Sequence, residues 1–165
     1  MLHCDVGVHY LRLTSDHQQL AYVLRPGEIE APAGLRAGMA EGNRLQDVFT
    51  QSWKIGQSGN AILARSLATA HAAGISDPKI YSHSLGYYLH EPGPLMGLPW
   101  NQSDIPGRGD VLMNLYTAYT VELSIEQPVP EWEGQRVRFM LEEDAAITPY
   151  GVHYINGRQR EFYLV

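Results

Sequence analysis

The sequence predicts an α+β domain in which helices cover one face of a mostly antiparallel sheet. Three observations predict it: extended apolar segments near the N-terminus, two stretches of helical periodicity after them, and further extended segments up to the C-terminus. The chain has 165 residues, of which 44% are hydrophobic and 18% charged, a balance typical of a globular rather than a disordered protein. We therefore expect one domain, residues 1–165, with its own core.

The first half of the chain predicts a strand pair followed by two helices. Residues 2–24 are extended and mostly apolar on both sides of a polar stretch at 14–17, which favours two antiparallel strands. Residues 25–42 are rich in Pro and Gly, and we expect a loop or irregular connection there. Helical periodicity predicts one helix from Asn43 to just before Gly56 and a second from Ser58 or Asn60 to Gly74.

The second half predicts strands separated by turns. An apolar run over 80–89 precedes a stretch over 92–107 whose Pro and Gly residues predict a loop. The runs 111–125 and 136–147 predict the longest strands, with a turn over 127–134 between them. Asn156 and Gly157 lie between the runs 152–155 and 161–165, and this pair predicts a closing hairpin.

Charge and composition exclude several classes of protein. The 12 Lys and Arg residues against 18 Asp and Glu residues give a net charge of −6, which argues against a nucleic-acid partner. No apolar run is long enough to span a bilayer, and the first residues lack the features of a signal peptide, so we expect no membrane association and take the cytoplasm as the default location. The single cysteine, Cys4, excludes an internal disulfide.

Acidic and histidine residues occupy segments in which sheet cores carry apolar side chains. They are Asp5, Asp16 eleven residues later, His83, His90 seven residues after it, Glu122 and Glu143. Carboxylates brought together repel one another unless cations lie between them, and carboxylate oxygens with one imidazole suit a pair of divalent ions such as Mn²⁺, Co²⁺, Zn²⁺ or Fe²⁺. Two such ions can share one water, lower its pKa and polarise a carbonyl, which is typical of hydrolases.

The order and spacing of these residues resemble the pita-bread metallopeptidases, the family of methionine aminopeptidase, aminopeptidase P, prolidase and creatinase. The Ser15-Asp16 pair, the segment 83–86, the His90-Glu91-Pro92 triplet and the Glu143-Asp144 pair carry the resemblance, which extends over residues 2–155. It implies a curved pita-bread (creatinase/aminopeptidase-like) sheet that lacks an upstream helix and strand segment. Uncovered apolar sheet surface would result, which predicts a homodimer or association with the missing segment.

The resemblance also implies a role for each candidate residue. Two divalent metal ions (Mn²⁺, Co²⁺ or Zn²⁺) would be held by Asp5, Asp16, His83, Glu122 and Glu143, with Asp16 bridging them. Glu122 would also accept the proton of the attacking water, and His90 would stabilise the tetrahedral intermediate. The implied activity is that of an aminopeptidase or dipeptidase, similar to Xaa-Pro aminopeptidases, which hydrolyses a peptide bond near the N-terminus of a peptide or dipeptide with a metal-bridging hydroxide.

Two of these assignments have close competitors. Glu126 lies four residues after Glu122, and the two share a strand face, so sheet periodicity cannot separate them. The Thr-Val-Glu context of Glu122 and its 21-residue distance from Glu143 favour Glu122. Glu142 is adjacent to Glu143, but neighbours in a strand point to opposite faces. The Glu143-Asp144 pair favours Glu143.

The sequence also departs from the family pattern. His17-Gln18-Gln19 follows the second aspartate where family members often have Thr-Arg, so packing behind the site is altered. Lys79 and Leu141 stand where proline-cleaving members carry a histidine and an arginine, which puts proline specificity in doubt, with Arg138 as the one candidate substitute.

Two alternative functions remain. One is a catalytically inactive pita-bread module, or inactive fragment, that binds peptides or proteins; the other is a metal-independent amidinohydrolase like creatinase. The retention of all five metal-ligand residue types argues against both, whereas the truncation favours the first.

Overall fold

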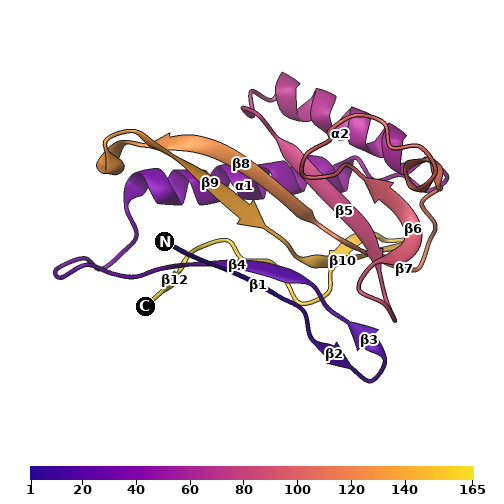
Figure 1. The fold of residues 1–165 in the computed structure, drawn as a ribbon, viewed down its shortest axis with the longest axis horizontal. Helices are drawn as coiled ribbons and strands as arrows, with labels where there is room; N and C mark the ends of the chain where they lie inside the picture. The colour runs from indigo at the N-terminus through magenta and orange to yellow at the C-terminus, as the bar shows by residue number, and fades with distance from the viewer.

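The computed structural model describes residues 1–165 (Figure 1). It has two α-helices, α1 (Ala33–Gln51) and α2 (Gly59–Ala72), and neither is long and apolar enough to cross a membrane. Short 3₁₀ turns occur at η1 (Arg108–Asp110) and η2 (Pro130–Trp132). The strands are β1 (Leu2–Val6), β2 (His9–Tyr10), β3 (Leu13–Thr14), β4 (His17–Tyr22), β5 (Lys79–Leu85), β6 (Glu91–Met96), β7 (Thr117–Thr120), β8 (Glu122–Val129), β9 (Gln135–Leu141), β10 (Asp144–Thr148), β11 (Gly151–Tyr154) and β12 (Tyr163–Leu164).

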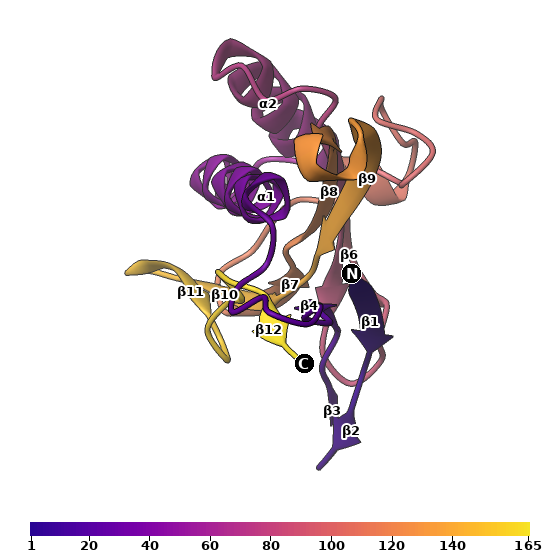
Figure 2. The same cartoon turned by 90° about the vertical axis from the view of Figure 1, so that its left-hand side faces the viewer.

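The strands form a curled, mostly antiparallel sheet system. A seven-stranded sheet has the order β11-β10-β7-β5-β8-β9, with β6 paired to β5, and a three-stranded sheet has the order β1-β4-β12. Gln18 of β4 pairs with Glu142 through an isolated antiparallel bridge, which connects the two sheets. Both helices lie on the same side of β5, β8 and β9 (Figure 2). The predicted α+β class, with helices on one face of an antiparallel sheet, is confirmed.

The core lies between the helices and the sheet because each carries an apolar face. Buried side chains of α1, including Leu35, Met39 and Phe49, join those of β8 and β9 in one cluster. The Ser58 side chain accepts a hydrogen bond from the Ala61 backbone N–H and caps α2 where the sequence predicts its start, and Gly74 has a φ of +77° just after its end. The predicted second helix is therefore confirmed.

Helix α1 begins at Ala33, ten residues before the predicted start at Asn43, so the prediction of a loop over 25–42 is wrong in its second half. The loop prediction rests partly on Gly34, Gly38 and Gly42, which are typical of loops. They are four residues apart and share one helix face that packs against the sheet: a Cβ at Gly38 would lie 2.1 Å from Cζ of the buried Phe139. These glycines therefore allow the helix backbone to approach the sheet closely rather than breaking the helix.

Two further predictions are wrong because sheet pairing overrides local turn signals. The Pro-rich stretch that predicts a loop contains β6, which tolerates Pro92 and Pro94 because it pairs with β5 alone and has a free edge. The Asn156-Gly157 pair does not close a hairpin. Strand β12 pairs in parallel with β4 instead of with β11.

The two longest predicted strands are each interrupted next to the candidate site residues. The run 111–125 forms β7 and β8 with Val121 between them, and the run 136–147 forms β9 and β10 with residues 142 and 143 between them. The Val121 backbone N–H donates to the Glu143 carbonyl at 2.7 Å, so the two interruptions lie side by side. Both interruptions are next to Glu122 or include Glu142.

Candidate metal centre

Five side chains form a row across the sheet system. Asp5 of β1 stands opposite Gln18 of β4, and Gln18 pairs with Glu142. Glu122 of β8 stands opposite Tyr81 of β5, and it comes directly before the Leu123–Leu141 pair, which places it beside Glu142. Residues in register on neighbouring strands share a face about 4.8 Å apart. The row therefore brings three carboxylates together from distant parts of the sequence.

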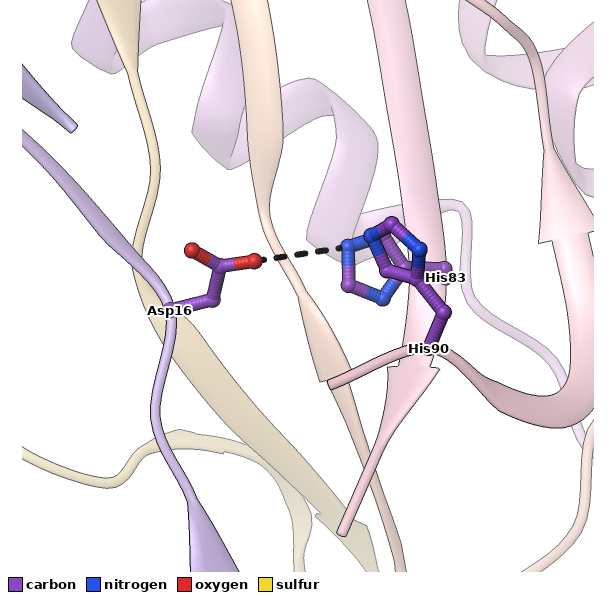
Figure 3. A group of neighbouring side chains, drawn as sticks. All are labelled: Asp16, His83 and His90. Atoms are coloured by element: carbon purple, nitrogen blue, oxygen red, sulfur yellow. Dashed lines mark ion pairs between the residues drawn. The ribbon is translucent and has the colours of Figure 1, made fainter. Parts of the chain in front are cut away.

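A second group lies beside this row. Asp16 is in the segment between β3 and β4, and its Oδ2 lies 3.6 Å from Nε2 of His83 on β5 (Figure 3). The His90 ring, just before β6, has its centroid 4.1 Å from that of His83. The backbone N–H of Asp16 donates to both carboxylate oxygens of Asp144, each at 3.2 Å, which fixes the start of β4.

Most of the predicted site residues converge. Three sets have ligand atoms within 4.8 Å of one another: Asp16, His83 and His90; His83, Glu122 and Glu142; and Asp5, Asp16 and Glu142. Together they contain Asp5, Asp16, His83, His90 and Glu122 from the sequence prediction, and Glu142.

The structure places Glu143, a predicted ligand, outside the three sets, and it separates Glu122 from Glu126. Glu143 faces away from the cluster: its Oε1 accepts from the Gln159 backbone N–H at 2.7 Å and from Gln19 Nε2 at 3.2 Å. The physical reason is that successive side chains of an extended chain point to opposite sides. Gln18 and its partner Glu142 face the cluster, so Gln19 and its partner Glu143 face the other side. Glu126 is paired with Arg138 at 2.8 Å and lies in none of the three sets.

Burial shifts the pKa values of the cluster toward the neutral forms. It lowers the pKa of His83 to about 4, with a further contribution from His90. Burial raises the pKa of Glu122 and of Glu142, and for Glu142 the negative charges of Glu122 and Asp16 add to the increase. The pKa of Asp16 is raised by burial and by Asp5. Acids gathered in this way are stabilised in their ionised form by a cation.

The residues present fit a divalent metal. Two buried polar atoms of the cluster, His83 Nε2 and Glu142 Oε1, have no hydrogen-bond partner. Buried polar atoms are almost always paired, so two orphaned ligand atoms in one cluster require an explanation. A neutral imidazole and carboxylate oxygens are the donors that Mn²⁺, Zn²⁺ and Co²⁺ accept. The candidate ligands are Asp5, Asp16, His83, Glu122 and Glu142, with His90 beside them.

A small cavity opens next to the cluster. Its volume is about 220 Å³, and Asp5, Gln18, Tyr81 and Glu122 line it on the cluster side. Lys79 and Arg138 line it further along the sheet. A larger groove of about 870 Å³ touches Ser15 and Asp144 on the other side, but none of the candidate ligands. The small cavity therefore adjoins the candidate ligands Asp5 and Glu122, and the larger groove does not.

Sequence reasoning missed one residue of the site. Gln18 contacts both Glu122 and Glu142, although the sequence marks it only as a departure from the family pattern. In the structure Gln18 lies on β4 two residues after Asp16, and a spacing of two puts both side chains on one side of an extended segment.

Comparisons with known proteins give matches through structure alone. No protein-family model matches the sequence, and no curated protein matches it significantly. An X-Pro aminopeptidase from Thermotoga maritima is 17% identical with a TM-score of 0.67, over 98% of this chain and 40% of that one. An Xaa-Pro dipeptidase from Bacillus anthracis is 21% identical with a TM-score of 0.66, over 99% and 41%.

A protein of another kind has the same fold. The N-terminal domain of a FACT complex subunit from chickpea (Cicer arietinum) is 14% identical with a TM-score of 0.68, over 96% of this chain and 36% of that one. This chain thus spans about two fifths of the length of the structures that it matches. It has the pita-bread fold of the X-Pro aminopeptidases and prolidases.

Proposed function

We propose that the protein is a metal-dependent peptidase, an aminopeptidase or dipeptidase, that hydrolyses a peptide bond near the N-terminus of a short peptide. The convergence of Asp5, Asp16, His83, Glu122 and Glu142, with two buried ligand atoms left unpaired, carries the proposal. The shared fold with X-Pro aminopeptidases and dipeptidases supports it. Two divalent ions, Mn²⁺, Co²⁺ or Zn²⁺, held by these residues would lower the pKa of a water and polarise the scissile carbonyl.

The residues of the chain would have distinct tasks. Glu122, whose Oε1 accepts a hydrogen bond from Gln18 Nε2 at 2.9 Å, would help to hold the metal and would accept the proton of the attacking water. His90 is exposed and packs edge-on against His83, so its ring can reach a substrate in front of the cluster. Its N–H would donate to the oxygen on which negative charge develops.

The proposal is tested with dipeptides and tripeptides in the presence of Mn²⁺, Co²⁺ or Zn²⁺. We expect hydrolysis that a chelator abolishes. In His90→Ala we expect kcat to fall by about 100-fold, as for the loss of one oxyanion donor. The matched control is His153→Ala, an exposed histidine that contacts Thr148 and should leave kcat unchanged. Equal kcat values for both variants would contradict the role of His90.

A metal-independent binding module is the second candidate function. The observation that favours it is the same fold in a FACT complex subunit, which is not named as a peptidase. Apolar side chains of β1 and β12, such as Leu2, Val6 and Tyr163, are exposed, as expected of a surface that another chain or segment covers. The homodimer, or the association with an upstream segment, stays a prediction. Peptide binding without hydrolysis at any of the three metals would favour this candidate.

A further inference from the structure

Gln18 lies in the middle of the cluster and uses both hydrogens of its amide on it. The side chain is buried, with 5% of the residue exposed. Its Nε2 donates to Glu122 Oε1 at 2.9 Å and to Glu142 Oε2 at 2.8 Å. One neutral side chain therefore contacts two carboxylates that come from β8 and from the segment after β9.

The orientation of this amide follows from its neighbours. Gln18 Nε2 donates to Glu122 and Glu142, and the ionised carboxylates of a metal-bound site only accept hydrogen bonds, so the NH₂ group faces both acids. The amide oxygen then faces His3 of β1, whose Nε2 lies 3.0 Å from Gln18 Oε1 and donates to it. Contacts from β1, from β8 and from the segment after β9 thus determine which way the amide points. The backbone bridge between Gln18 and Glu142 holds the two residues in register.

We propose that Gln18 is a positioning residue for the metal centre, holding one oxygen of Glu122 and one of Glu142 so that the other oxygen of each is presented as a ligand. This inference rests on the proposed metal site. It explains why Glu142 Oε1 is buried without a partner while Glu142 Oε2 is bonded. A carboxylate with one oxygen fixed in this way binds a metal through a single oxygen in a set direction, and such outer contacts orient first ligands.

Substitution of Gln18 by the similarly sized, apolar methionine removes the two donors. Gln19→Met is the matched control, because Gln19 is the next residue of β4, is part-buried and also donates to a glutamate, Glu143, at 3.2 Å. We expect Gln18→Met to weaken Mn²⁺ binding by about 10–100-fold, measured by calorimetric titration. Gln19→Met should stay within about threefold of the wild type, because it faces the other side of the strand.

A measurement on the unaltered protein covers the case in which Gln18→Met does not fold. In ¹H–¹⁵N spectra, the side-chain amide hydrogens of Gln18 should exchange slowly with solvent and shift when Zn²⁺ is added, and they should remain protected in the metal-bound protein. Rapid exchange, or loss of protection on binding Zn²⁺, would overturn the positioning role.

The outcomes separate this inference from the proposed function. If the wild type and Gln18→Met bind Mn²⁺ equally, the positioning role is wrong and the metal site stands. If both variants bind less tightly to the same extent, the effect is a general one of strand β4 and the role is also wrong. If the wild type binds neither Mn²⁺ nor Zn²⁺, both the inference and the proposed metal-dependent function are wrong.

Discussion

Glu142→Gln is expected to weaken Mn²⁺ binding by at least about 100-fold, more than changes outside the ligand shell usually cause. Glu142 is 1% exposed, and its Oε1 is one of two unpaired buried atoms in the cluster. The amide that replaces the carboxylate has no negative charge to offer a cation. If its carbonyl oxygen keeps the hydrogen bond from Gln18 Nε2, its NH₂ group, which cannot ligate a cation, takes the place of Oε1. Calorimetric titration with Mn²⁺ at pH 7 measures the effect.

Glu143→Gln is the control, because the same chemical change is made one residue further along the chain. Glu143 is also buried, at 3% exposure, but it accepts from Gln159 and Gln19 on the other side of the strand. The Mn²⁺ affinity of the Glu143→Gln protein should stay within about threefold of the wild type, because residue 143 faces away from the site. The opposite pattern, with Mn²⁺ binding lost in Glu143→Gln and kept in Glu142→Gln, would show that Glu143 is the ligand, as the sequence predicts.

The metal-free protein is expected to lose stability as the pH rises from about 6.5 to 9. Burial raises the pKa of Glu122 and Glu142, and it raises that of Asp144 to about 7. In the unfolded chain the pKa of each group is about 4. Each group therefore stabilises the fold fully below about pH 4, and this contribution is lost as the pH rises through the pKa that the group has in the folded protein. His83 and His17, whose pKa values burial lowers, act the opposite way, but only below their unfolded value near 6.5. Above that pH the acids alone contribute.

Thermal unfolding at pH 6.5 and 9, with a chelator or with Mn²⁺, measures this effect. A tenfold difference in proton affinity between the folded and unfolded states corresponds to about 1.4 kcal/mol, so we expect Tm of the metal-free protein to fall by at least about 4 °C. With Mn²⁺ the fall should disappear, because metal binding needs the ionised ligands. In metal-free Glu142→Gln the fall should be smaller than in the wild type. A metal-free Tm that stays level or rises over this range would contradict the destabilising effect of the buried acids.

Local signals in the sequence were sufficient for part of the fold and failed where long-range packing decides. Ser58 and Gly74 mark the ends of α2 because capping depends on neighbouring residues alone. Gly34, Gly38 and Gly42 cannot be interpreted in this way, since their purpose is the contact of α1 with Phe139 and other side chains of the sheet. The pairing of β12 with β4 joins residues about 140 positions apart, and the Asn156-Gly157 pair carries no information about it.

The candidate site shows the same division. Asp5, Asp16, His83 and Glu122 could be predicted to lie in one cluster, because their order along the chain resembles that of the ligands in the family. The structure brings the four side chains together. The choice between Glu142 and Glu143 depends on which of them pairs with Gln18 of β4, a contact across 124 residues. Strand alternation shows that only one of the two can face the site, but the register of distant strands decides which one.

The proposed function depends above all on metal held by Asp5, Asp16, His83, Glu122 and Glu142. Anomalous diffraction at the zinc edge, from crystals of the protein grown with Zn²⁺, tests this most directly. We predict anomalous peaks within about 2.0–2.2 Å of His83 Nε2 and of Glu142 Oε1, with the amide of Gln18 still bonded to Glu122 and Glu142. An absence of peaks at this cluster, or peaks only at other histidines such as His17 beside Glu143, would contradict it.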